Sequence, residues 1–72
     1  MAAKVIVAHI TGTVWKIEVK VGDAVSSGDV VSILESMKME MPVESEFDGT
    51  VAELHVAEGQ AVAEGAPLMT LS

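Results

Sequence analysis

The amino-acid sequence repeats itself at a constant offset of 37 residues, and this repeat limits the possible folds more than any other feature. Placing the stretch from Gly12 above the stretch from Gly49 without a gap gives nine identities among the 24 positions from Gly12 to Glu35. The identical pairs are Gly12/Gly49, Thr13/Thr50, Val14/Val51, Val19/Val56, Gly22/Gly59, Ala24/Ala61, Val25/Val62, Gly28/Gly65 and Leu34/Leu71. Glycines at expected turns and apolar residues at expected core positions are what two copies of one supersecondary unit would share. We therefore predict two matched halves related by an approximate internal twofold.

Each half has the pattern of short strands. "TVWKIEV" (13–19) alternates, with Val14 and Lys16 on one side and Trp15 and Ile17 on the other, so we expect Trp15 to be at least partly buried. "VVSILES" (30–36) is a β-branched run, "KVIVAH" (4–9) is answered by "PVESE" (42–46), and the glycine-rich connections carry one short strand each. The sequence predicts an all-β fold, a flattened barrel or sandwich of two four-stranded antiparallel sheets, over the single domain 1–72.

Length and charge exclude several classes of function. The chain has 72 residues, no cysteine and a net charge of −7, so disulfides and thiolate sites are impossible and phosphate backbones or anionic lipids are poor partners. No apolar run approaches the roughly 18 residues of a membrane span, and no cleavable leader is evident. We expect a cytoplasmic monomer that binds neither nucleic acid nor membranes. The initiating Met1 and the absence of a linker favour a complete chain.

The constant offset makes residues 36–41, within "SILESMKMEMPV", the junction between the halves. A connection this short is most simply a tight hairpin. With Met37 and Lys38 as its two turn residues, Ser36 faces Met39, Glu35 faces Glu40 and Leu34 faces Met41.

This turn has poor chemistry for a tight hairpin. Two-residue turns favour glycine, asparagine or aspartate because they require positive φ, and neither Met37 nor Lys38 is of that kind. The opposed Glu35 and Glu40 would also repel each other. A site that breaks local rules without structural gain is a candidate functional site, with Lys38 as a nucleophile. Taken alone, the residues equally allow a solubilising lysine between flexible methionines.

Four other polar residues are weaker candidates. His9 and His55 lack a typical metal-ligand spacing, so we expect them to face solvent. Asp23 and Asp29 lie next to glycines, which favours a role in turns over a catalytic carboxylate pair.

The stretch "ESMKME" (35–40) resembles the attachment motif of biotinyl carrier domains, usually Ala-Met-Lys-Met, and nearly the whole chain is similar to the biotin/lipoyl attachment domain family, its free-standing biotin carboxyl carrier type in particular. The resemblance implies a barrel-sandwich hybrid with Lys38 on the hairpin tip as the site of covalent biotin attachment. Met37 and Met39 are then the neighbours that a biotin protein ligase reads. Two departures from the family are Ser36 in place of alanine and the lack of an inserted thumb loop between Lys20 and Asp29.

By this resemblance the domain is a non-catalytic carrier. The modified Lys38 becomes a swinging arm, and biotin shuttles a carboxyl group from a biotin carboxylase to a carboxyltransferase. Two alternatives stay open. A lipoyl ligase could attach lipoate to Lys38, although the lipoyl family usually has Asp-Lys-Ala there, or the chain could be an unmodified β-sandwich interaction module.

Overall fold

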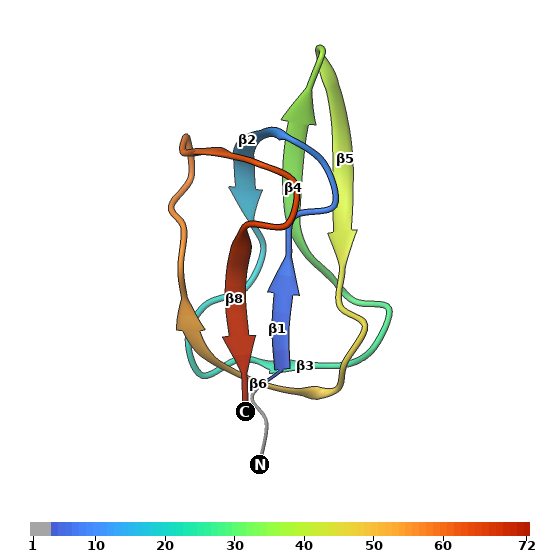
Figure 1. Ribbon diagram of the computed structural model, residues 1–72. Coiled ribbons are helices and arrows are strands. Elements are labelled where there is room, and N and C mark those ends of the chain that lie inside the picture. Colours follow the sequence, from blue (N-terminus) through green and yellow to red (C-terminus); the bar gives the residue numbers. More distant parts are fainter. Residues whose placement is uncertain (1–3) are drawn as a thin grey trace.

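The computed structural model describes residues 4–72, and in this range the protein is built only of strands and connections (Figure 1). The strands are β1 (Lys4–Val7), β2 (Gly12–Ile17), β3 (Ala24–Val25), β4 (Val30–Ser36), β5 (Met39–Glu44), β6 (Gly49–Leu54), β7 (Ala61–Val62) and β8 (Pro67–Leu71). Over the same range no helix has the length and apolar character to cross a membrane. The predicted all-β class and the four strands per half are confirmed.

The strands form two antiparallel four-stranded sheets, in the orders β1-β8-β6-β3 and β5-β4-β2-β7. Adding 37 to the residue numbers of β1 gives positions in β5, and the same operation converts β2 into β6 and β3 into β7. Strands β4 and β8 are related in the same way, so the repeat maps one sheet onto the other. Each sheet contains strands from both halves of the sequence, which confirms the predicted twofold and shows that neither half forms a sheet alone.

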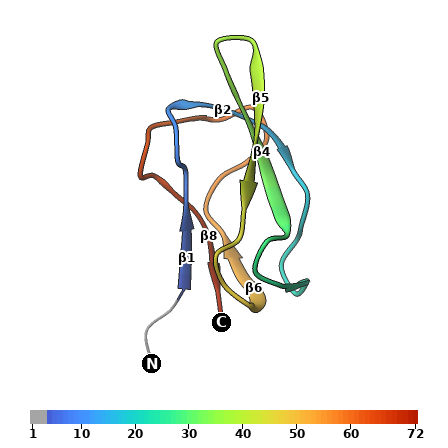
Figure 2. The same cartoon turned by 90° about the vertical axis from the view of Figure 1, so that its right-hand side faces the viewer.

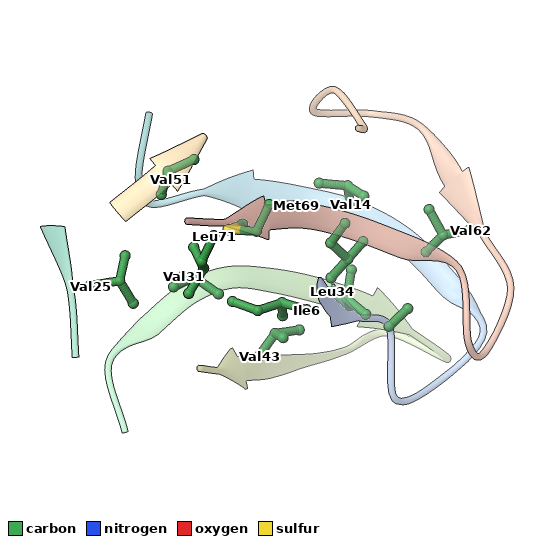
Figure 3. Packing of buried hydrophobic residues seen from close by; sticks show 12 residues of the cluster. Ile6, Val14, Val25, Val31, Leu34, Val43, Val51, Val62, Met69 and Leu71 are labelled. Carbon is green, nitrogen blue, oxygen red and sulfur yellow. The ribbon is translucent and has the colours of Figure 1, made fainter. Parts of the chain in front are cut away.

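The core between the sheets obeys the same twofold (Figure 3). Every buried side chain of the described chain has a buried mate 37 residues away. These pairs are Ile6/Val43, Ala8/Ser45, Val14/Val51, Val25/Val62, Val31/Leu68, Ser32/Met69 and Leu34/Leu71. The two buried serines are satisfied, because Ser32 donates to the Lys16 carbonyl at 2.8 Å and Ser45 donates to the Phe47 carbonyl at 2.6 Å. This core of matched pairs fixes the sheets against each other and positions the hairpin described below.

The predicted burial of Trp15 is wrong. The register between β2 and β4 shifts between Val14 and Lys16, and the equivalent shift between β6 and β8 lies between Val51 and Glu53. This β-bulge inserts one residue and reverses the alternation, since two residues of the bulged strand then oppose one on its partner. Val14 is consequently buried in the core, whereas Trp15 is 46% exposed.

The β4–β5 hairpin lies at the opposite end of the molecule from the start of β1 and the end of β8 (Figures 1 and 2). Under the twofold, the hairpin corresponds to the place where β8 pairs with β1, with Leu71 opposite Lys4. The chain is covalently closed at one of these two equivalent places and open at the other. Within residues 4–72, the hairpin is thus the turn that links the first half to the second.

Candidate functional site

The candidate site is the turn between β4 and β5, and its register is the predicted one. Ser36 pairs with Met39, Glu35 pairs with Glu40 and Leu34 pairs with Met41. Met37 and Lys38 form the two-residue turn, with φ angles of 51° and 65°. Two consecutive residues in the left-handed region define the turn that matches the twist of a hairpin.

The turn stands clear of the rest of the sheet. The pairing of β2 with β4 ends at Thr13 opposite Glu35, so residues 36–39 are held only by the hairpin itself. In Figures 1 and 2 the hairpin extends past all other strands. The turn is therefore accessible to a partner, and of the residues outside the hairpin Ile10 lies beside it.

The side chains at the tip are directed into solvent. Met37 is 92% exposed, Met39 is 62% exposed, and Lys38 is also in the exposed class. Within residues 4–72, the Lys38 ammonium group has neither a hydrogen bond nor an ion pair. The amine at Nζ is thus free to enter the active site of another protein.

The local conformation of the tip costs free energy. A left-handed conformation costs a residue with a Cβ atom roughly 1–2 kcal/mol, and Met37 and Lys38 both adopt it. Every other positive φ in the described chain belongs to a glycine, namely Gly22, Gly28, Gly59 and Gly65. The fold thus uses glycine wherever a positive φ serves the structure alone, and departs from this rule only at the tip.

The base of the hairpin is packed tightly. A Cβ atom on Gly12 would collide with the carbonyl oxygen of Glu35, so β2 approaches β4 more closely than any larger residue would allow. Glu35 in turn is paired with Glu40, without a basic partner for either among the described residues. A rigid base therefore supports a tip that is exposed and conformationally costly.

A small apolar hollow of about 180 Å³ lies beside the tip. It is lined by Ile10, Ser36, Met37, Met39 and Met41. Ile10 was not predicted as a site residue from the sequence; its repeat mate Phe47 is likewise a half-buried apolar residue. Met37, Met39 and Met41 thus form one apolar surface with Ile10 beside the turn that carries Lys38.

A groove of about 550 Å³ lies between the edge strands β1 and β5 and does not include Lys38. His9 and His55 are exposed, as predicted, and His55 Nε2 lies 2.6 Å from the Thr70 hydroxyl. Residues 4–72 contain no group of three or more His, Asp or Glu side chains placed to hold a metal ion.

Asp23 and Asp29 form turns, as predicted. The Asp23 carboxylate accepts a hydrogen bond from the Lys20 amide at 3.0 Å, and the Asp29 carboxylate accepts one from the Ser26 amide at 2.9 Å. Each carboxylate thus closes a turn that contains a glycine with positive φ.

Comparison with known proteins gives consistent matches. Residues 1–71 match the family model described as biotin-requiring enzyme. The chain is 46% identical over 64 residues to the biotin/lipoyl attachment protein of Bacillus subtilis, a match that covers 89% of this chain and 88% of that protein. It is 42% identical over 71 residues to the biotin carboxyl carrier protein of Streptococcus mutans, covering 99% of this chain and 55% of that protein.

The fold matches a part of much larger solved structures. The urea carboxylase of Kluyveromyces lactis superposes with a TM-score of 0.92 and 33% identity, covering all of this chain but 6% of the carboxylase. A single-chain, multi-domain long-chain acyl-CoA carboxylase superposes with a TM-score of 0.90 and 26% identity, covering 97% of this chain and 7% of that enzyme. The chain thus corresponds to most of one curated relative, about half of another and a small segment of the carboxylases.

Proposed function

Because the chain belongs to the biotin/lipoyl attachment family, we propose that it is a biotin carrier in which a biotin protein ligase joins biotin to Lys38 by an amide bond. One observation carries the proposal: the exposed Lys38 occupies a costly left-handed turn at the tip of a projecting hairpin. The matching relatives include a biotin carboxyl carrier protein and segments of biotin-dependent carboxylases.

The residues of the tip suit covalent attachment. Lysine is the residue required, because its amine becomes a nucleophile on losing a proton, whereas a guanidinium stays protonated. Lys38 has no partner among the described residues that would have to be displaced first. Met37 and Met39 expose apolar surface on both sides of the amine, where the ligase would read them.

The domain is a carrier and not a catalyst. Lys38 would hold the biotin, which would supply the chemistry of carboxyl transfer between a biotin carboxylase and a carboxyltransferase. The chain contributes by exposing the attachment site: Lys38 supplies a long flexible side chain, and the hairpin holds the backbone of this residue away from the core (Figure 1). A tether of this kind raises the effective concentration of the cofactor at each active site it can reach.

The test is the intact mass of the protein after co-expression with a biotin protein ligase. We expect one biotinyl increment, and we expect its complete loss in Lys38→Arg with no change in thermal unfolding, because an exposed tip contributes little packing. Lys4, Lys16 and Lys20 remain in that variant as internal controls. An unmodified wild-type protein, or an increment that survives in Lys38→Arg, would contradict the proposal.

Lipoate is the second candidate, favoured by one observation, the name of the Bacillus subtilis relative as a biotin/lipoyl attachment protein. Co-expression with a lipoyl ligase in place of the biotin ligase tests it by the same mass measurement. A lipoyl increment without a biotinyl one would assign lipoate to Lys38. No increment with either ligase would favour an unmodified interaction module.

The carboxylase partners, the cytoplasmic location and the monomeric state belong to this proposal as predictions of the sequence. Light scattering on the purified protein tests the last of these. A mass close to the 7.5 kDa of one chain is expected.

A further inference from the structure

The outer surface of the sheet that carries the hairpin has a row of three apolar residues and one lysine, in which Trp15 and Pro42 are exposed and Ile33 is partly buried. The bulge leaves Trp15 without a partner on β4 and places the next residue, Lys16, opposite Ile33, which pairs on its other side with Pro42. Trp15 is 46% exposed, and Lys16 Nζ lies 5.9 Å from the centroid of its ring. We call these four residues, Trp15, Lys16, Ile33 and Pro42, the Trp15 row.

The internal twofold supplies a control for this row. At the equivalent positions of the other sheet stand Ala52, Glu53, Thr70 and Val5, paired in the same register. There the central residue is polar, and its hydroxyl is engaged by His55 at 2.6 Å. Both sheets have the same bulges and matching buried residues, so the fold itself does not require tryptophan, isoleucine or proline in the Trp15 row.

The position of the row indicates what it contacts. Ile33 and Lys38 are five residues apart on the hairpin strand, roughly 16 Å at the rise of a β-strand. A standard interface buries about 800 Å² on each partner, which corresponds to a disc about 16 Å in radius. A partner centred on the hairpin tip therefore reaches the Trp15 row.

Two kinds of enzyme act at the tip, and they differ in how close their surfaces must come to the hairpin. The bare lysine stem extends only about 6 Å from its Cα atom, so an enzyme that acts on the free amine must bring its surface close around the hairpin. An enzyme that acts on the far end of a loaded arm can stay farther away. Proximity to the row is thus demanded of the enzyme that modifies the bare lysine.

We propose that the Trp15 row is a docking surface for the biotin protein ligase, with Trp15 as its anchor, an inference that rests on the proposed function. Tryptophan is enriched among the residues that dominate binding energy at interfaces. Lys16 is a positive charge beside this apolar row on a protein of net charge −7. The matching surface of the ligase is accordingly apolar, with a carboxylate placed to meet Lys16.

The first test exchanges residues between equivalent positions. Trp15→Ala with Ile33→Thr installs at the row the residues that the other sheet already has, so the double variant is expected to fold. The control Val5→Thr with Val7→Thr removes exposed apolar surface from the other sheet, where Val5 is 39% and Val7 is 45% exposed. With biotinyl-adenylate supplied, we expect the double variant to raise the KM of ligase for the carrier about tenfold with kcat nearly unchanged, and the control to leave both unchanged.

The second test uses the wild-type sequence and so does not depend on any variant folding. Trp15 is the only tryptophan, so 5-fluorotryptophan gives a single ¹⁹F resonance. Addition of ligase bound to a non-hydrolysable biotinyl-adenylate analogue should shift or broaden this resonance, whereas addition of biotin carboxylase to the biotinylated protein should not.

The outcomes separate this inference from the proposed function. A wild-type protein that is not biotinylated at all refutes the proposed function. Three results would refute the docking surface and leave the carrier function intact. In the first, the double variant is biotinylated with an unchanged KM; in the second, the KM of the control variant rises as much as that of the double variant. In the third, the ¹⁹F resonance responds only to the carboxylase.

Discussion

At the scale of single residues, Met37 and Met39 are exposed apolar side chains that contribute little to folding. Their exposed fractions of 92% and 62% contrast with 1% for Met69, which belongs to the core. A side chain that remains in water gains almost nothing from the hydrophobic effect on folding. Met37 and Met39, unlike Met69, therefore present apolar surface that a partner protein can contact.

We predict that Met37→Asp with Met39→Ala, which creates the lipoyl-type sequence Asp-Lys-Ala, slows biotinylation without unfolding the domain. Surface changes of this kind usually alter the free energy of unfolding by about 0.5 kcal/mol or less. Ligase kinetics measure the first effect and urea denaturation the second. As a matched control, Met69→Ala should cost about 2–5 kcal/mol because it opens a cavity in the core. Unchanged ligase kinetics would mean that recognition lies in the placement of the hairpin and not in its methionines.

At the scale of the element, the turn is a hairpin with the right geometry and the wrong residues for stability. Gly22, Gly28, Gly59 and Gly65 have positive φ like the turn residues, and all occupy connections outside the site. Asn-Gly is the sequence best suited to a turn with two positive φ angles. Keeping Met-Lys at this place therefore lowers stability, which is consistent with selection for recognition and modification.

We predict that Met37→Asn with Lys38→Gly stabilises the domain by about 1 kcal/mol, because it relieves two left-handed residues that have Cβ atoms. The same variant cannot be biotinylated, since the amine is gone. Equilibrium urea denaturation against Lys38→Arg isolates the effect of the turn from the effect of losing the modification. A loss of stability would show that the methionine and lysine side chains support the hairpin in a way that the structure does not reveal.

The hairpin was predictable from the sequence in a way that the bulges were not. The constant offset fixed which residues join the halves, and six junction residues leave room for only one tight register, so the pairing of Leu34 with Met41 followed. A bulge adds one residue without a gap in the repeat, and simple alternation therefore assigned Trp15 to the wrong face. The repeat did contain a signal: Val14 and its mate Val51 are identical, whereas Trp15 is matched by Ala52. The role of Lys38 could not follow from the turn alone, because poor turn chemistry indicates a cost and not its purpose.

At the scale of the whole molecule, the twofold makes each half depend on the other. The sheet β5-β4-β2-β7 draws its edge strands β5 and β7 from the second half and its central strands from the first, and the other sheet does the reverse. Most contacts therefore join residues far apart in sequence, and separate halves would leave their apolar faces without partners. The hairpin is the one place where the chain crosses between the halves, opposite the open ends where β8 pairs with β1.

This symmetry predicts that the closed and open ends of the molecule can be exchanged. A circular permutant that joins Ser72 to Lys4 and begins at Met39 should keep the fold, because Leu71 and Lys4 are paired across the same kind of ladder as Leu34 and Met41. The offset sets the linker at five residues, the number between Glu35 and Met41, with Asn-Gly at the positions equivalent to Met37 and Lys38. We expect a cooperative thermal transition within about 10 °C of the wild type, since a change of 1–2 kcal/mol moves the midpoint of a domain of this size by roughly that amount.

Placing Met-Lys-Met in the new linker, at the positions equivalent to 37–39, should then move biotinylation to the opposite end of the molecule if the ligase needs only a hairpin on a matched sheet. If the Trp15 row is the docking surface, the relocated lysine, which projects from the sheet that bears Ala52 and Thr70, should instead be modified about tenfold more slowly than Lys38.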